Sequence, residues 1–116
     1  MIFNNKLIIT HGSTVRKFSA YTARAEAEKI RYSMSVMTGH THRGGRFFTT
    51  TRAGIIQAVE CFCLCSLAPE YMCNPDWQQG LVLAEVDEDM LSIEMIPFHQ
   101  VGGKLVARWR GKEYQP

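Results

Sequence analysis

The sequence Lys-Leu-Ile-Ile-Thr-His-Gly at residues 6–12 and the sequence Ser-Met-Ser-Val-Met-Thr-Gly-His-Thr-His at residues 33–42 decide the fold class. Each opens with a short run rich in apolar and β-branched side chains, over residues 6–10 and 33–38, which is typical of a buried strand. Each run is followed at once by a turn that carries histidine. The two stretches therefore predict two strands with histidine at their carboxyl ends.

The segment between these strands has the periodicity of a helix. Residues 19–31 predict a helix that Ser19 caps, because serine is a favoured N-cap residue. The apolar side chains that share one face of this helix are Ala20, Ala23, Ala27 and Ile30. A strand, a helix and a strand of this length predict a right-handed crossover between parallel strands. Ligands of such sheets gather outside the carboxyl ends of the strands, where both histidine turns lie.

The rest of the chain is predicted to be rich in β-structure. Its turn signals are Gly54, the Asp-Glu-Asp of residues 87–89 and Gly102-Gly103. The predicted strands cover residues 47–51, 55–63, 80–86, 90–96 and 104–109. Residues 66–79 predict a long surface loop. We therefore expect residues 1–116 to form one mixed α/β domain, in which a crossover helix joins two parallel strands and a β-rich part follows.

The composition is that of an ordinary globular domain, with 116 residues, 46% hydrophobic and 21% charged. No apolar run approaches the roughly 18 residues that span a bilayer, and residues 1–10 lack a secretory pattern, so we expect no membrane contact and a cytoplasmic location. The four cysteines are then expected to be reduced thiols. Cys61, Cys63 and Cys65 alternate in the sequence, so on one strand their thiols would face the same side, and we expect them to be small buried hydrophobes. Structural zinc usually binds Cys-x-x-Cys pairs, so this spacing suits it poorly.

Basic residues gather in the first half of the chain. Residues 1–54 hold nine Lys and Arg against two Glu, whereas residues 55–116 hold four against nine acidic residues. This asymmetry attracts anionic ligands to the first half. Four residues that follow the histidine turns are candidate contacts to a substrate phosphate: Arg16, Lys17, Arg43 and Arg46. The alternative is that these four are solvated charges beside the strand ends.

Three histidines form a candidate metal site at the strand ends. The turn Gly39-His40-Thr41-His42 places two imidazoles two residues apart, and its glycine permits a sharp turn. Neutral imidazole is the commonest metal ligand among side chains. The predicted metal ligands are therefore His11, His40 and His42, whereas His99 lies in an unrelated region and is expected at the surface.

These motifs resemble those of the calcineurin-like metallophosphoesterases. His11-Gly12 and Gly39-His40-Thr41-His42 are similar to the last two motifs of that family, and residues 11–19, 69–71 and 74–80 are similar to its phage and bacterial members. The resemblance covers nearly the whole chain. It implies the second half of a β-sandwich flanked by helices and a phosphatase-type hydrolase with two metals, Mn²⁺ or similar. In that centre His11 and His40 would bind one metal and His42 the other.

The carboxylate motifs of the family do not precede His11. The family pattern begins with Asp-x-His, Gly-Asp and Gly-Asn-His, and only ten residues stand before His11. Neutral imidazoles neither offset the charge of two divalent ions nor bridge them, so the centre needs carboxylates. Asp76, Asp87, Glu88 and Asp89 lie in later turns and are expected to be solvated. We therefore expect the C-terminal half of a metallophosphoesterase domain, inactive alone and completed by an N-terminal half.

Two other functions stay open at this point. The chain is alternatively a non-catalytic module on the same scaffold, which binds nucleic acid, a nucleotide or a protein through its basic half. A third interpretation is self-association, in which facing histidines hold a structural metal and apolar sheet surface is covered. Hydrolysis of a phosphate ester with a partner half supports the enzyme, whereas salt-sensitive binding without hydrolysis supports the module.

Overall fold

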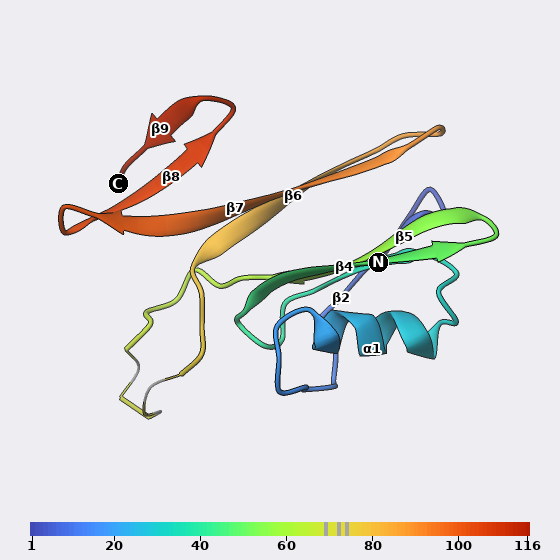
Figure 1. The fold of residues 1–116 in the computed structure, drawn as a ribbon, viewed down its shortest axis with the longest axis horizontal. Coiled ribbons are helices and arrows are strands. Elements are labelled where there is room, and N and C mark those ends of the chain that lie inside the picture. Colours follow the sequence, from blue (N-terminus) through green and yellow to red (C-terminus); the bar gives the residue numbers. More distant parts are fainter. Residues whose placement is uncertain (69, 72, 74) are drawn as a thin grey trace.

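The computed structural model describes residues 1–68, 70, 71, 73 and 75–116, and this part of the chain contains one helix and nine strands in two sheets (Figure 1). Pro69 and Asn74, which belong to two of the motifs quoted above, lie outside the described residues. The mixed α/β class predicted from the sequence is confirmed.

The first sheet contains the predicted crossover. Its strands, in spatial order, are β1 (Ile2–Phe3), β2 (Leu7–Thr10), β3 (Ser35–Thr38), β5 (Gly54–Cys61) and β4 (Gly44–Thr51). The strand β3 pairs in parallel with β2 on one side and with β5 on the other, while β1 and β4 pair antiparallel at the edges. The parallel pairing of β2 and β3 confirms the strand, helix and strand prediction. The parallel pairing of β3 with β5 places the carboxyl end of a third strand beside those of β2 and β3.

The crossover helix α1 (Tyr21–Lys29) is shorter than predicted at both ends. Its N-cap residue is Ala20, at φ 71°, and no side chain caps it, so the prediction that Ser19 caps the helix is wrong. The Ala20 N–H donates instead to the carboxylate of Glu60 in β5, a partner 40 positions away that local sequence rules do not register. The helix ends before Arg31 and Tyr32 because both adopt positive φ angles, 55° and 53°.

The second sheet is a meander of β6 (Gly80–Val86), β7 (Leu91–Val101), β8 (Lys104–Trp109) and β9 (Lys112–Tyr114). The strand β7 runs five residues beyond its predicted end at position 96. It pairs with β6 as far as Pro97 and with β8 from Phe98 onward, so the proline lies where the strand changes partner. A proline there removes a hydrogen-bond donor without ending the strand.

Apolar side chains fill both faces of the first sheet. On one face, α1 contributes Ala23 and Ala27, which pack with Val36 and Ala58. On the other, Leu7, Met37 and Val59 pack with Ile93 of β7. The helix and the β6–β7 hairpin therefore lie on opposite sides of the sheet, below and above it in Figure 1. The parallel strands thus lie between two packed layers, and their carboxyl ends lie together at one end of the sheet.

In the described part of the chain, no helix combines the length and the apolar character that crossing a lipid bilayer requires.

Candidate metal centre

The carboxyl ends of three parallel strands bring the metal-ligating side chains of this chain together. The pairing places Thr10 beside Thr38, and Thr38 beside Glu60, at the ends of β2, β3 and β5. The residues that follow are His11, the turn at 39–42 and the segment at 62–65. Segments far apart in the sequence thus meet because parallel strands present their ends at one edge.

His11 and His40 form a pair at this edge. Their ring centroids lie 4.7 Å apart and their planes are inclined by 63°. The hydroxyl of Thr38 donates to the carbonyl oxygen of His11 at 2.8 Å, which ties the end of β3 to the end of β2. Gly12 adopts φ 82°, and a Cβ atom there would lie 2.5 Å from the same hydroxyl, so glycine is needed for this contact. These contacts hold the strand ends that carry the two imidazoles next to each other.

The loop after His11 is anchored by Glu26 of α1. One carboxylate oxygen accepts hydrogen bonds from the backbone N–H groups of Ser13 and Thr14, at 3.2 and 3.1 Å, and from the Lys29 ammonium at 2.9 Å. Burial by itself raises the pKa of Glu26, but these bonds to the charged form outweigh it and lower the pKa to about 2. The ionised carboxylate thus stabilises the loop that carries His11.

We expect Glu26→Gln to remove a pH-dependent part of the stability. Because folding lowers the pKa from 4.5 to about 2, the wild-type chain gains stability on the order of 3 kcal/mol above pH 4.5 and loses it as the pH falls toward 2. The variant lacks this titration, so its unfolding free energy changes less over that range. Urea denaturation of both proteins at a series of pH values measures the difference, and parallel curves would contradict the role assigned to Glu26.

The turn that carries His40 and His42 is fastened to β5 by a buried acid. Glu60 is 0% exposed, and its carboxylate accepts hydrogen bonds from the hydroxyl of Thr41 and from the Ala20 N–H. The guanidinium of Arg43 lies 3.8 Å from the same carboxylate. Glu60 is not among the residues predicted from the sequence. An acidic residue in an apolar predicted strand is nevertheless a signal, because buried carboxylates need partners.

A cavity of about 300 Å³ lies beside this turn, with His40, His42 and Asp76 in its wall. The Asp76 carboxylate is exposed and accepts a hydrogen bond of 2.8 Å from the side-chain amide of Gln78. Asp76 is predicted from the sequence to be a solvated turn residue, and the structure places it in the same cavity wall as two of the predicted metal ligands. The ring of Trp77 packs against His42 with centroids 4.5 Å apart, which orients that imidazole.

His42 lies against two thiols rather than against the other two imidazoles. Among the described residues, one group of three or more His, Cys, Asp and Glu side chains has all its ligand atoms within 4.8 Å: His42, Cys63 and Cys65. This His/Cys cluster has the ligand types and spacing to hold a metal ion. The three predicted histidine ligands are thereby divided, with His11 beside His40 and His42 beside the thiols.

The interpretation of the cysteines as alternating buried hydrophobes is wrong beyond Cys61. The strand β5 ends at Cys61, and Phe62 turns the chain through φ 61°, which breaks the alternation. Cys63 is half-buried and Cys65 is exposed. Burial and the neighbouring Cys65 thiol raise the pKa of Cys63 to about 11. A turn inside a predicted strand is the feature that periodicity alone misses.

The four basic residues proposed for phosphate binding have different surroundings. Arg43 is buried, and its guanidinium donates to the backbone carbonyls of Arg16 and Lys17 at 2.5 and 2.8 Å. Arg46 donates to the carbonyl of Ile93 at 2.6 Å, which links β4 to the second sheet. The side chains of Arg16 and Lys17 are exposed on the loop after His11. Of the four, these two have side chains free to meet a ligand in solvent.

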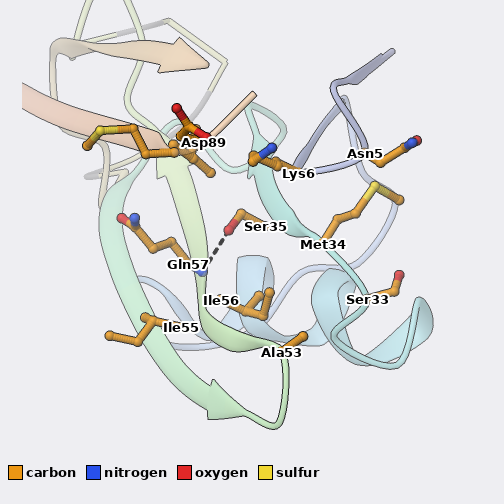
Figure 2. A pocket seen from close by; sticks show the side chains of 12 residues that line it. Asn5, Lys6, Ser33, Met34, Ser35, Ala53, Ile55, Ile56, Gln57 and Asp89 are labelled. Carbon is orange, nitrogen blue, oxygen red and sulfur yellow. Dashed lines mark hydrogen bonds between the residues drawn. The ribbon is translucent and has the colours of Figure 1, made fainter. Parts of the chain in front are cut away.

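A second cavity, of about 290 Å³, lies at the opposite edge of the first sheet (Figure 2). Its wall includes Lys6 and Ser35, at the amino ends of β2 and β3, and Gln57 in the middle of β5. The hydroxyl of Ser35 accepts a hydrogen bond of 3.0 Å from the Gln57 backbone N–H, and the Lys6 ammonium donates to the carbonyl of Glu88. The buried side-chain oxygen of Gln57, in contrast, has no hydrogen-bond partner among the described residues.

His99 is exposed, as expected, and lies in the part of β7 beyond the predicted end of that strand. The candidate centre therefore consists of the His11–His40 pair, the cavity beside it and the His42–Cys63–Cys65 cluster.

Comparison with family models, with curated proteins and with solved structures finds no match to this chain.

Proposed function

We propose that this chain supplies the histidine side of a calcineurin-like, metal-dependent phosphoesterase centre, as the C-terminal half of that domain. The observation that supports this most is the pairing of His11 with His40, 29 positions apart in the sequence, with ring centroids 4.7 Å apart at adjacent strand ends. The family resemblance implies that these two imidazoles share one metal. Their contact supports that assignment independently of the motif spacing.

The residues of this chain would position metal and substrate rather than complete the chemistry. Divalent ions in such a centre lower the pKa of a bound water, align the phosphate and stabilise charge on its oxygens. His11 and His40 would hold one ion, and His42, in the wall of the adjacent cavity, would serve the second. The exposed Arg16 and Lys17 would attract the anionic substrate. The bridging carboxylate would come from outside residues 1–116, from a partner N-terminal half.

Reconstitution tests this proposal. The chain is co-expressed with an N-terminal metallophosphoesterase half that carries the Asp-x-His, Gly-Asp and Gly-Asn-His motifs, and the purified complex is assayed with Mn²⁺ and bis-p-nitrophenyl phosphate. We expect hydrolysis by the complex and none by either half alone, because neither has all the ligands. The metal-free complex, prepared with a chelator, serves as the control.

Two outcomes would overturn the proposal in different ways. A well-folded complex that binds Mn²⁺ but hydrolyses neither phosphodiester nor phosphomonoester would contradict the enzyme assignment. If that complex instead bound single-stranded DNA in a salt-sensitive way, the result would favour a non-catalytic nucleic-acid module. Efficient turnover by the chain alone would contradict the need for a partner.

A further inference from the structure

Two cysteines and one histidine at the edge of the first sheet are arranged as a set of soft metal ligands. We propose that His42, Cys63 and Cys65 form a binding site for a thiophilic divalent ion, with Zn²⁺ as its occupant. The proposal shares His42 with the proposed phosphoesterase centre, where that imidazole would serve the second ion. It does not rest on that assignment, because the other two ligands are thiols that the histidine motifs do not include.

One ligand-atom distance in the cluster matches tetrahedral zinc, and the others lie within about 1 Å of the distances such a site needs. Zn–S bonds of about 2.3 Å and Zn–N bonds of about 2.0–2.1 Å separate the ligand atoms of a tetrahedral site by about 3.5–3.8 Å. The Sγ atom of Cys65 lies 3.7 Å from Nδ1 of His42. All three ligand atoms lie within 4.8 Å of one another. Small rotations of the side chains are therefore enough to bring them to one ion.

The backbone on both sides of the cluster is held in an unusual shape. His42 and Phe62 both adopt left-handed conformations, with φ 58° and 61°. Such conformations are uncommon for residues other than glycine and are found where the surrounding structure imposes them. The Phe62 N–H donates to the Arg43 carbonyl at 2.9 Å, so the two segments that carry the ligands are bonded to each other.

Further backbone bonds fix the Cys63 segment in place. The Cys63 N–H donates to the carbonyl of Gln78, and the Cys63 carbonyl accepts from the N–H of Gly80, both at 3.1 Å. The ring of Phe62 fills the space beside Gly44, where an added Cβ atom would lie 1.9 Å from it. The Cys63 segment is thus held against residues 78–80, and a ligand held in place before binding lowers the entropy lost when an ion binds.

The ligand types favour zinc over the hard ions of phosphoesterase chemistry. Thiolates select soft or borderline metals such as Zn²⁺, whereas Mn²⁺ and Mg²⁺ prefer carboxylate and carbonyl oxygens. Three protein ligands also leave one position of a tetrahedral zinc ion for water or another ligand. His42 borders the cavity of about 300 Å³ that holds Asp76 in its wall, so solvent has access to the site.

The test is titration of the full, reduced chain with Co²⁺, which adopts tetrahedral geometry and gives absorption bands from thiolate coordination. We expect one Co²⁺ per chain with such a band, and loss of the band when one equivalent of Zn²⁺ is added. Cys65→Ser is expected to weaken Co²⁺ binding by about 100-fold or more, since even outer-shell changes cost about 10–100-fold. Because Cys65 is exposed, this variant is expected to stay folded.

Matched variants separate this site from other metal binding in the chain. Cys73→Ser removes another exposed thiol outside the cluster, and His11→Asn removes an imidazole of the other pair, so both are expected to keep the band. Wild-type affinity for Co²⁺ in Cys65→Ser, or loss of the thiolate band in Cys73→Ser, would overturn the proposal. So would the absence of any thiolate band in the wild-type chain, even if Mn²⁺-dependent hydrolysis were reconstituted.

Discussion

Replacing Glu60 by alanine is expected to lower the free energy of unfolding by about 3–5 kcal/mol, the range found when one partner of a buried ion pair is removed. Glu60 is 0% exposed and interacts with Ala20, Thr41 and Arg43. Its loss leaves the buried Arg43 guanidinium without its counter-charge. For a small domain, whose total stability is typically about 5–15 kcal/mol, this is a large fraction.

Urea denaturation of the wild-type chain and of its Glu60 and Arg43 variants measures this effect. Glu60→Gln is the matched control, because it keeps the side-chain shape and one carbonyl acceptor but removes the charge, and we expect an intermediate loss. In the double variant Arg43→Met, Glu60→Leu both charges are absent, so the loss is expected to be smaller than the sum of the single changes. A loss below about 1 kcal/mol in Glu60→Ala would show that the pair does not anchor the fold.

Replacing His40 by asparagine is expected to reduce the Mn²⁺-dependent activity of the reconstituted complex by about 100-fold or more. The reason is that His40, paired with His11, would be a direct metal ligand, and changes one shell further out already cost about 10–100-fold. Asparagine keeps a polar side chain at this position of the turn but removes the imidazole nitrogens.

The control for this prediction is His99→Asn, which removes an exposed histidine of β7 far along the chain from the turn. We expect it to keep the full activity of the complex, and we expect both variants to unfold at the wild-type urea concentration. If His40→Asn retained more than about a tenth of the activity while still assembling with the partner half, His40 would not be a metal ligand of the hydrolytic centre.

Much of the first sheet could be predicted because its signals are local. Residues 6–10 and 33–38 are short apolar runs, and the intervening segment has helical periodicity, so the crossover follows from chain length and handedness. The bounds of β6 and β8 also match, since both strands lie between clear turn signals. The approach of His11 to His40 follows from the same topology, because both come directly after parallel neighbours.

The sequence-based predictions are wrong where a side chain or backbone group bonds to a residue that is distant in the sequence. Ser19 has the right chemistry for an N-cap, yet Glu60 accepts from the Ala20 N–H instead and Ser19 is not used. Arg43 resembles a phosphate contact in the sequence, yet its donors bind backbone carbonyls inside the protein. Both outcomes depend on contacts between residues 26 to 40 positions apart, which local propensity does not register.

The sequence by itself determined the strand, helix and strand unit, because the apolar periodicity of each segment is local to that segment. It also determined that the histidines lie at the carboxyl ends of the two strands, because they follow those strands directly in the chain. Only the tertiary structure decided which ligands meet there. The turn at Phe62 swings Cys63 and Cys65 out of β5 and toward His42, and the bonds of Glu60 hold the turn that presents that imidazole. Such groupings arise from packing between distant segments, so they appear only once the sheet has assembled.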